Sequence, residues 1–242
     1  MPKSPVLLAL DTATSVCSVA LACDNTIHAI AREVGQRHTE FVLALVDQLL
    51  ASHDRRLADC DAIAFGAGPG SFTGLRVACG VAQGLAFGIE RPVIPVANLA
   101  AGALEAFARC PAARVVLVAQ DARMNEAYVA VYAMASGRLT EVAPPALAAP
   151  DELLALAARH QAEVIAGSAV DVFREQLHPF SGTRIEGTLG TARTIAQLAL
   201  EALEAGRVVA ASAAAPIYVR DRVALTVEQR RSRGGSSLPA SA

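Results

Sequence analysis

The chain has 242 residues, of which 53% are hydrophobic and 18% charged, and its formal net charge is −2. The length suits one large domain or two small ones, and the near-neutral charge argues against binding nucleic acid without a partner. Charged residues interrupt every apolar run before the roughly 18 residues that a membrane span needs. The first residues lead into a strand-like segment without a signal peptide, so we expect a cytoplasmic protein that does not contact a membrane.

The lysines, cysteines and histidines narrow the chemistry further. Lys3 is the only lysine, which excludes lysine-based phosphate clamps and Schiff-base catalysis. The five cysteines form no CxxC pair, which is typical of buried thiols in a reducing compartment. The five histidines form no HExxH or HxxxH pair, so the sequence predicts no metal site.

Hydrophobic patterning predicts the elements in chain order. In the first half we expect strands at 6–10, 17–23 and 27–33, a helix at 39–51 and a buried strand at 62–65. A long helix at 72–88, a strand at 93–96 and a further helix at 98–109 follow. In the second half we expect strands at 114–120, 127–135, 139–142 and 164–166, helices at 151–159 and 191–205, and an extended piece at 217–219. Pro144, Pro145 and Pro150 predict a loop before the helix at 151, and Gly206 a cap on the last helix.

The order of these elements occurs twice along the chain. It predicts an α/β protein with the duplicated ribonuclease H-like fold that actin, sugar kinases and Hsp70 share, in two βββαβα-like domains. We expect the N-terminal domain to span 1–110 and to carry partner-binding helices, and the C-terminal domain to span 111–227. Residues 228–242 are rich in Arg, Ser, Gly and Pro and are expected to form a disordered tail.

A glycine-rich segment at 66–76 lies where the buried strand meets the long helix. Ser71 is of the residue type preferred as a helix N-cap, and free N–H groups at a helix start favour an anion. The spacing nevertheless matches neither GxxxxGK[ST] nor GxGxxG, and Phe72 stands where a GxSxG nucleophile would be. The candidate nucleotide- or anion-binding residues are Asp11, Gly70, Ser71, Thr73 and Gly74.

Asp11 is the most informative acidic residue because it follows the first strand directly. In nucleotide-using proteins of this fold, an acidic residue at this place faces phosphate and magnesium. The alternative is an Asx-turn that closes the first hairpin. Without a lysine or a second convincing acid nearby, we favour the turn for Asp11, and we weigh Asp121 in the second half in the same way.

The helix predicted at 72–88 has an unusual face of small residues. Gly80, Gly84 and Gly88 recur every fourth residue, although each interior glycine destabilises a helix by roughly 1 kcal/mol relative to alanine. Such a face predicts the close approach of another helix, either inside the subunit or from a partner. Leu43 lies off the main apolar stripe of the helix at 39–51, which favours a subunit interface. The residues expected there are Phe41, Leu45, Ser71, Phe72, Arg76, Gly80, Gly84 and Gly88.

Several segments together resemble the TsaB family of bacterial tRNA threonylcarbamoyladenosine biosynthesis proteins. The most specific is Gly68-Pro69-Gly70-Ser71-Phe72-Thr73-Gly74-Leu75-Arg76. The other segments lie at 8–14, 17–21, 82–86, 121–123 with Glu126 and Tyr128, and 216–220. The resemblance thus extends from about Val6 to Arg220, and between Arg138 and Val208 it consists of little beyond the order of elements.

The resemblance implies the duplicated fold and a non-catalytic role. TsaB proteins pair with a paralogue, the TsaD subunit, which transfers a threonylcarbamoyl group to adenosine 37 of tRNAs that read codons beginning with A, and a small TsaE ATPase joins them. The catalytic paralogue carries a metal-binding HxxxH after the strand that matches 93–96. This chain has Asn98 and Gly102 at those two places, which implies that it has no catalytic residue and holds no metal.

Three functions follow from these observations. In the leading hypothesis the helices at 39–51 and 72–88 dock onto a TsaD-type paralogue and form a heterodimer. The chain alone is expected to form a homodimer and to meet tRNA only indirectly. It is expected to bind no cofactor tightly by itself, and whether ATP binds at the complex interface is left open. The alternative is a nucleotide-dependent phosphotransferase that uses Asp11 and the 68–76 loop. The third is a tRNA binder that uses the arginines of the tail, namely Arg220, Arg222, Arg230, Arg231 and Arg233.

Overall fold

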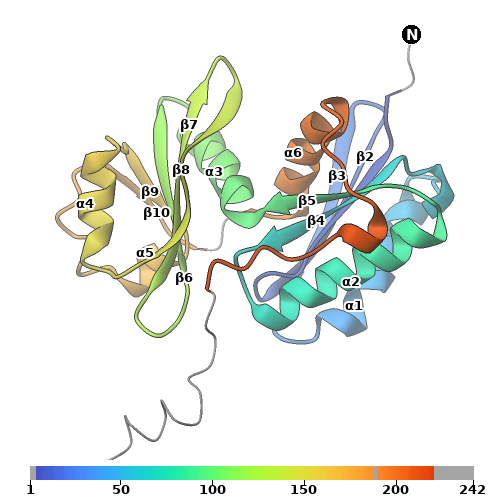
Figure 1. Cartoon of the computed structure of the whole chain (residues 1–242), viewed down its shortest axis with the longest axis horizontal. Helices are drawn as coiled ribbons and strands as arrows, with labels where there is room; N and C mark the ends of the chain where they lie inside the picture. Colours follow the sequence, from blue (N-terminus) through green and yellow to red (C-terminus); the bar gives the residue numbers. More distant parts are fainter. Residues whose placement is uncertain (1–3, 188–189, 221–242) are drawn as a thin grey trace, which may run out of the picture.

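Two five-stranded sheets with the same order of strands form the frame of the molecule (Figure 1). The structure is a computed structural model that describes residues 4–187 and 190–220. The first sheet has the order β3-β2-β1-β4-β5 and the second the order β8-β7-β6-β9-β10. In each sheet the first three strands are antiparallel and the later ones parallel to the first. This repeat confirms the predicted duplicated ribonuclease H-like fold.

The elements of the first half lie close to their predicted positions. They are β1 Leu7–Asp11, β2 Val16–Cys23, β3 Thr26–Glu33, α1 His38–Ser52, η1 Leu57–Asp59, β4 Ala62–Gly68, α2 Phe72–Gly88, β5 Val93–Ala97 and α3 Asn98–Arg109. Every residue of β1 and β4 is buried because helices cover both faces of the sheet. Helix α2 begins where predicted, and the Ser71 hydroxyl accepts a hydrogen bond from the Gly74 N–H at 3.3 Å, as an N-cap does.

The second half differs from the prediction at one strand. Its elements are β6 Val115–Asp121, β7 Ala127–Ala135, β8 Arg138–Ala148, α4 Glu152–Arg159, β9 Val164–Ala166, α5 Ala169–Val172, β10 Thr183–Ile185, α6 Ala192–Glu204 and η2 Ala211–Ala213. The loop predicted at Pro144 and Pro145 was wrong, because β8 continues through both prolines. This is allowed because β8 is an edge strand whose register with β7 shifts between Val129 and Tyr132. The short α5 and β10 were not predicted.

Two helices connect the halves of the chain. Helix α3 follows β5 but packs on the second sheet, where Leu99 and Phe107 join Val116 in one apolar cluster. Helix α6 comes from the second half but packs on the first sheet, where Ile195 and Ala199 cover Leu7. In Figure 1 α6 accordingly lies beside β2 and β3, and α3 beside β7 and β8. Each sheet therefore needs a helix that the other half of the chain supplies.

No helix in the described part of the chain is long and apolar enough to cross a membrane. The tail predicted at 228–242 lies outside the described residues.

The anchoring of α6 on the first sheet gives a test of this arrangement. The Ser18 hydroxyl of β2 accepts a hydrogen bond from the Ala192 N–H at 2.9 Å in a buried position. We expect Ser18→Ala to lower the free energy of unfolding by about 1–3 kcal/mol, because it leaves that N–H buried without a partner. Urea denaturation followed by circular dichroism measures the change. Ser52→Ala, at the exposed end of α1, is the control and is expected to change stability by less than about 0.5 kcal/mol. Equal effects of the two substitutions would contradict the role given to the Ser18–Ala192 hydrogen bond.

Candidate functional site

The glycine-rich segment after β4 packs directly onto the turn between β1 and β2. A Cβ atom at Gly74 would collide with the Thr12 carbonyl oxygen, so only glycine lets α2 approach this turn. The contact is reinforced because the Thr12 hydroxyl donates to the Gly74 carbonyl at 2.7 Å and the Ser71 N–H donates to the Ala13 carbonyl at 2.8 Å. The glycines of this segment therefore serve a close approach between two parts of the chain.

Protein groups already occupy several hydrogen-bond donors of this segment. The N–H of Gly68 donates to the Asn98 side chain at 2.7 Å, and the N–H groups of Ser71 and Gly74 donate as described above. A loop that cradles a phosphate instead points such N–H groups at the ligand. This geometry weakens the anion-binding interpretation of the segment.

Asp11 lies beneath the segment and is 1% exposed. Its Oδ1 accepts hydrogen bonds from the Asn98 Nδ2 at 3.0 Å and from the Ala13 N–H at 3.2 Å. The bond to the residue two positions later is that of an Asx-turn. Desolvation by burial raises the pKa of the Asp11 carboxyl to about 6, although the hydrogen bonds from Asn98 and the backbone act in the opposite direction.

The raised pKa makes a prediction about pH. The folded chain binds this proton more tightly than the unfolded chain, so the contribution of Asp11 to stability is full below about pH 4 and is lost as the pH rises through about 6. Asp11→Asn keeps an acceptor for Ala13 and removes the buried charge. We expect it to raise the free energy of unfolding by roughly 1–3 kcal/mol near pH 7 and to leave it unchanged near pH 4.

Urea denaturation of the wild type and the Asp11→Asn variant across this pH range measures the difference. A variant that is less stable than the wild type near neutral pH would show that the fold depends on the ionised carboxylate, as a cation-binding aspartate would require.

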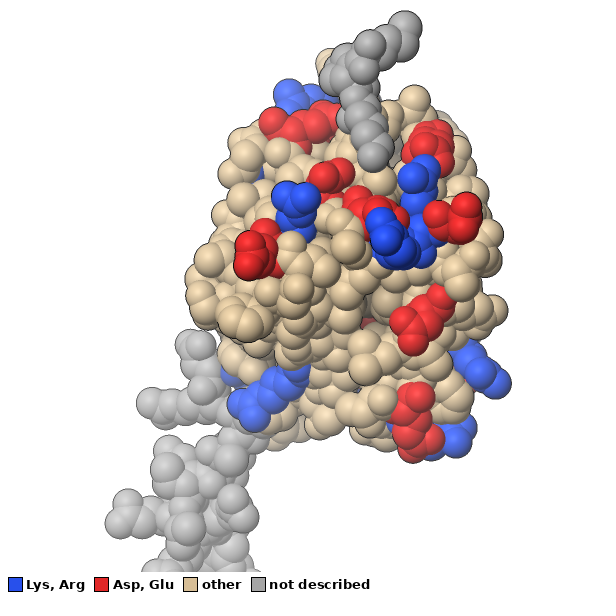
Figure 2. Space-filling view, turned by 90° about the vertical axis from the view of Figure 1, so that its right-hand side faces the viewer, with Lys and Arg blue, Asp and Glu red and all other residues tan. Residues whose placement is uncertain are grey.

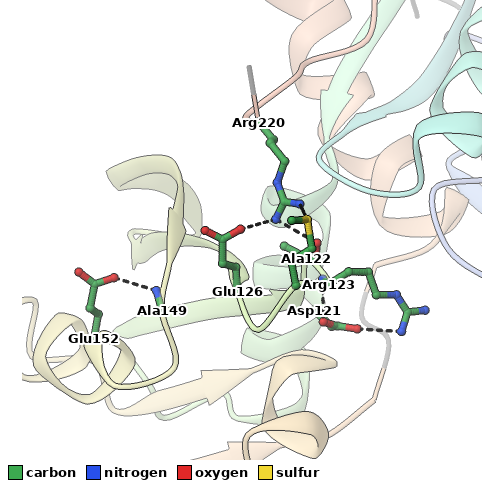
Figure 3. A network of polar contacts seen from close by, with 8 residues as sticks. Asp121, Ala122, Arg123, Glu126, Ala149, Glu152 and Arg220 are labelled. Carbon is green, nitrogen blue, oxygen red and sulfur yellow. Dashed lines mark hydrogen bonds and ion pairs between the residues drawn. The ribbon is translucent and has the colours of Figure 1, made fainter. Parts of the chain in front are cut away.

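The corresponding turn of the second half repeats this arrangement. Asp121 ends β6, and its Oδ1 accepts a hydrogen bond from the Arg123 N–H at 2.9 Å. The Arg123 side chain pairs with the same carboxylate at 3.2 Å, and Glu126 pairs with Arg220 at 2.5 Å. Figure 3 shows these charged side chains around one loop, with Arg220 reaching it from the last described segment of the chain. Asp121 thus closes a turn, as Asp11 does.

A cleft of about 550 Å³ lies between the two turns. The β1–β2 turn, the start of α1, the glycine-rich segment, the loop after β6 and residues 217–220 line it. Of the five candidate nucleotide- or anion-binding residues, the structure brings Gly70 and Ser71 to this cleft. Asp11 and Gly74 are buried behind its wall, and Thr73 is exposed on α2. The candidates therefore do not converge on one ligand position.

The residues predicted at a partner interface lie mostly on one outer surface. Gly80, Gly84 and Gly88 are exposed, and a Cβ atom at each would have no neighbour within 4 Å among residues 4–187 and 190–220. Within the part of the chain that the structure describes, the glycine face thus serves no internal packing. Phe72 and Phe87 on the same helix are 44% and 79% exposed, and the Arg76 guanidinium lies 3.9 Å from the centre of the Phe72 ring.

Helix α1 lies beside α2 (Figure 1) and corrects one prediction. Leu45 was expected at the interface, but it is 4% exposed and belongs to the core under the first sheet. The outward leucine of α1 is Leu43, which is 51% exposed. Phe41 is half-buried, with the guanidinium groups of Arg32 and Arg37 about 5 Å from its ring. We call the surface formed by Leu43, Phe72, Gly80, Gly84 and Phe87 the helical face.

Asn98 stands where the resemblance places the first metal ligand of a catalytic paralogue. Both ends of its amide are used, since Nδ2 donates to Asp11 and Oδ1 accepts from Gly68. Within residues 4–187 and 190–220, no group of three or more His, Cys, Asp or Glu side chains is arranged to hold a metal ion. The two side-chain hydrogen bonds of Asn98 thus join the start of α3 to the ends of β1 and β4.

Sequence reasoning missed the role of the segment that ends at Arg220. Tyr218 packs on Phe72 with ring centres 5.7 Å apart, and its hydroxyl accepts from the Arg76 Nε at 3.2 Å. The available signal was an aromatic residue and an arginine, Tyr218 and Arg220, in the extended piece that follows Pro216. Their hydrogen bonds join residues 94 to 142 positions away, so the pattern alone could not show them.

These features define a duplicated ribonuclease H-like chain with a closed first turn and an open helical face. A sequence profile of the family described as TsaD, tRNA N6-adenosine threonylcarbamoyltransferase, matches residues 25–223. The chain therefore belongs to the TsaD family, and within it is a TsaB/YeaZ-type protein.

Individual relatives support this assignment. Over 122 residues the chain is 52% identical to the tRNA threonylcarbamoyladenosine biosynthesis protein TsaB of Haemophilus influenzae, covering 50% of this chain and 51% of that protein. Over 126 residues it is 47% identical to TsaB of Escherichia coli, covering 52% and 54%. The chain thus spans about half the length of these curated relatives.

A solved structure agrees with this assignment. It is a crystal structure from Pseudomonas aeruginosa, described as an uncharacterised protein with similarity to peptidase YeaZ, and its sequence is 36% identical to this chain. The two structures superpose with a TM-score of 0.82, and the match covers 89% of this chain and 100% of that one.

Proposed function

We propose that this chain is a non-catalytic subunit required for threonylcarbamoyl transfer to adenosine 37 of tRNAs that read codons beginning with A. It binds and activates a catalytic TsaD-type paralogue, together with a TsaE-type ATPase. The names of its relatives support the pathway, since they are described as threonylcarbamoyladenosine biosynthesis proteins. The observation that carries the scaffold role is the open glycine row of α2, at which added Cβ atoms would meet none of the described residues within 4 Å.

The glycine row favours a helix as the occupant of this surface. Three exposed glycines in one helix lower its stability and bring no close contact with the other described residues. They leave the backbone of α2 open to close approach by another helix, and Phe87 and Leu43 add exposed apolar area to the helical face. A paralogue of the same fold presents equivalent helices, so the two subunits can pack through a pseudo-twofold axis. The chain alone is then expected to form a homodimer through the same surface.

The non-catalytic role is supported by how the polar groups near the cleft are used. Asn98 replaces a metal-ligand histidine of the paralogue and is engaged at both ends of its amide. Asp11 is buried within an Asx-turn, away from the cleft lining. These side chains close the first turn of the first domain and leave the chemistry to the partner.

The glycine row can be tested by adding side chains to it. We expect Gly80→Leu and Gly84→Leu to abolish complex formation with the TsaD-type paralogue at micromolar concentrations, because a leucine holds the two helices apart. The fold is expected to stay intact, since each site is open. Gly80→Ala is the graded variant: it should stabilise the isolated chain by about 0.5–1 kcal/mol while weakening the complex. Size-exclusion chromatography and calorimetry measure binding, and thermal unfolding measures stability.

The matched controls are Ala155→Leu and Ala158→Leu on α4, where a leucine is added to an exposed helix position of the second domain. They should leave the complex unchanged. Full affinity of the Gly80→Leu and Gly84→Leu variants would show that the glycine row is not the contact surface.

An indirect role toward tRNA agrees with the distribution of charge. On the outer side of the first domain, Figure 2 shows basic and acidic side chains interspersed among the described residues rather than gathered by sign. Of the tail arginines considered as tRNA ligands, Arg220 is paired with Glu126. The other four lie outside the described residues.

The competing proposal is a nucleotide-dependent phosphotransferase, favoured by the cleft between the two turns. Titration calorimetry of Mg·ATP on the isolated chain separates the two proposals: binding that Asp11→Asn abolishes supports the enzyme, and no binding supports the scaffold. Reconstitution of tRNA modification with the TsaD-type and TsaE-type proteins, with and without this chain, then tests the proposed role directly. The scaffold proposal expects modification to require the chain and to tolerate Asp11→Asn.

A further inference from the structure

Residues 209–220, which we call the strap, run back across the molecule after α6. The strap first lies along the edge of the first sheet, where Val209 and Val93 exchange two backbone hydrogen bonds of 2.9 Å. It then follows α2, and the Ala214 carbonyl accepts from the Gln83 side chain at 2.9 Å. At Ile217 the backbone crosses the end of β4, donating to the Ala67 carbonyl at 2.7 Å.

Gly68 is the residue that lets the strap lie against β4. It has φ +122°, and a Cβ atom there would stand 2.6 Å from the Ile217 carbonyl oxygen. A side chain at this position would therefore both strain the backbone and displace the strap. Gly68 of the glycine-rich segment thus makes room for the backbone of the strap.

The end of the strap reaches the second domain. The Arg220 guanidinium donates to the Glu126 carboxylate at 2.5 Å and to the Ala122 carbonyl at 3.1 Å, and the arginine side chain is 13% exposed (Figure 3). Charge-assisted hydrogen bonds of this kind are among the stronger polar contacts. Figure 1 shows the same segment passing from the first domain toward β6, and residues 217–220 line the cleft.

Between these two anchors the strap touches the helical face. Tyr218 packs on Phe72 and bonds Arg76, and both Phe72 and Tyr218 are 44% exposed. A partner seated on this end of α2 would cover that aromatic pair. It would then immobilise the strap two residues before the arginine that holds the second domain.

We propose that the strap couples partner docking on the helical face to the separation of the two domains, and hence to the width of the cleft. This inference rests on the proposed function, because it takes the helical face as the docking surface. In one direction, a bound partner fixes Tyr218 and so strengthens the hold of Arg220 on the loop after β6. In the other direction, release of Arg220 lets the domains separate and displaces Tyr218 from Phe72. Such coupling is reciprocal by linkage.

The test measures the two ends of the strap separately. Donor and acceptor dyes are attached through azide side chains at Ala29 on β3 and Ala155 on α4, two exposed positions in different domains. Single-molecule energy transfer on the isolated full chain then reports the domain separation. We expect Arg220→Ala to broaden the distance distribution and shift it to longer distances, and to weaken binding of the TsaD-type paralogue about fivefold or more. Arg220→Lys should restore part of both effects, and Glu126→Gln combined with Arg220→Ala should add little to Arg220→Ala alone.

The control is Arg159→Ala on α4, an exposed arginine away from the strap, which should change neither measurement. An unchanged distance distribution in Arg220→Ala overturns the proposal. So does a broadened distribution with unchanged affinity, because the strap would then join the domains without coupling them to docking. The distance measurement needs no partner, and Gly80→Leu and Gly84→Leu test the docking surface without altering the strap. Unchanged affinity of Arg220→Ala therefore counts against the strap when the glycine variants lose binding, and against the docking surface when they keep it.

Discussion

The packing of the glycine-rich segment on the β1–β2 turn is the constraint on which the rest of the structure depends. The Thr12 carbonyl occupies the space that a Cβ atom of residue 74 would need, and the Thr12 hydroxyl bonds the Gly74 carbonyl. This contact sets the first turn of α2 against the end of β1 and closes the first domain over Asp11. With one side of α2 held on the sheet, its glycine row faces away from the subunit.

Two exchanged helices and the strap join the two halves of the chain, although their sheets are separate. Helices α3 and α6 each pack on a sheet that the other half of the chain forms. The strap then returns over Gly68 and holds the loop after β6 through Arg220. A surface on α2 is therefore connected to the second domain through a few short contacts, as the proposed coupling of the strap requires.

Sequence periodicity predicted most elements of the fold because their apolar residues repeat with the period of a helix or a strand. It was wrong for β8, where an edge position tolerates two prolines that would interrupt a central strand. Leu45 was misassigned for a related reason. Helix α1 is apolar over a wide arc, and only the position of the sheet shows that Leu45 points inward and Leu43 outward.

The sequence by itself determined the duplicated α/β plan, the absence of lysine chemistry and the row of glycines along α2, because each depends on residue types and spacing alone. Only the tertiary structure decided what these features do. The glycines of the 66–76 segment make room for the chain itself, whereas those at 80, 84 and 88 face open space, and spacing cannot distinguish the two cases. The contacts of Tyr218 and Arg220 likewise join residues about a hundred positions apart, which no local pattern encodes.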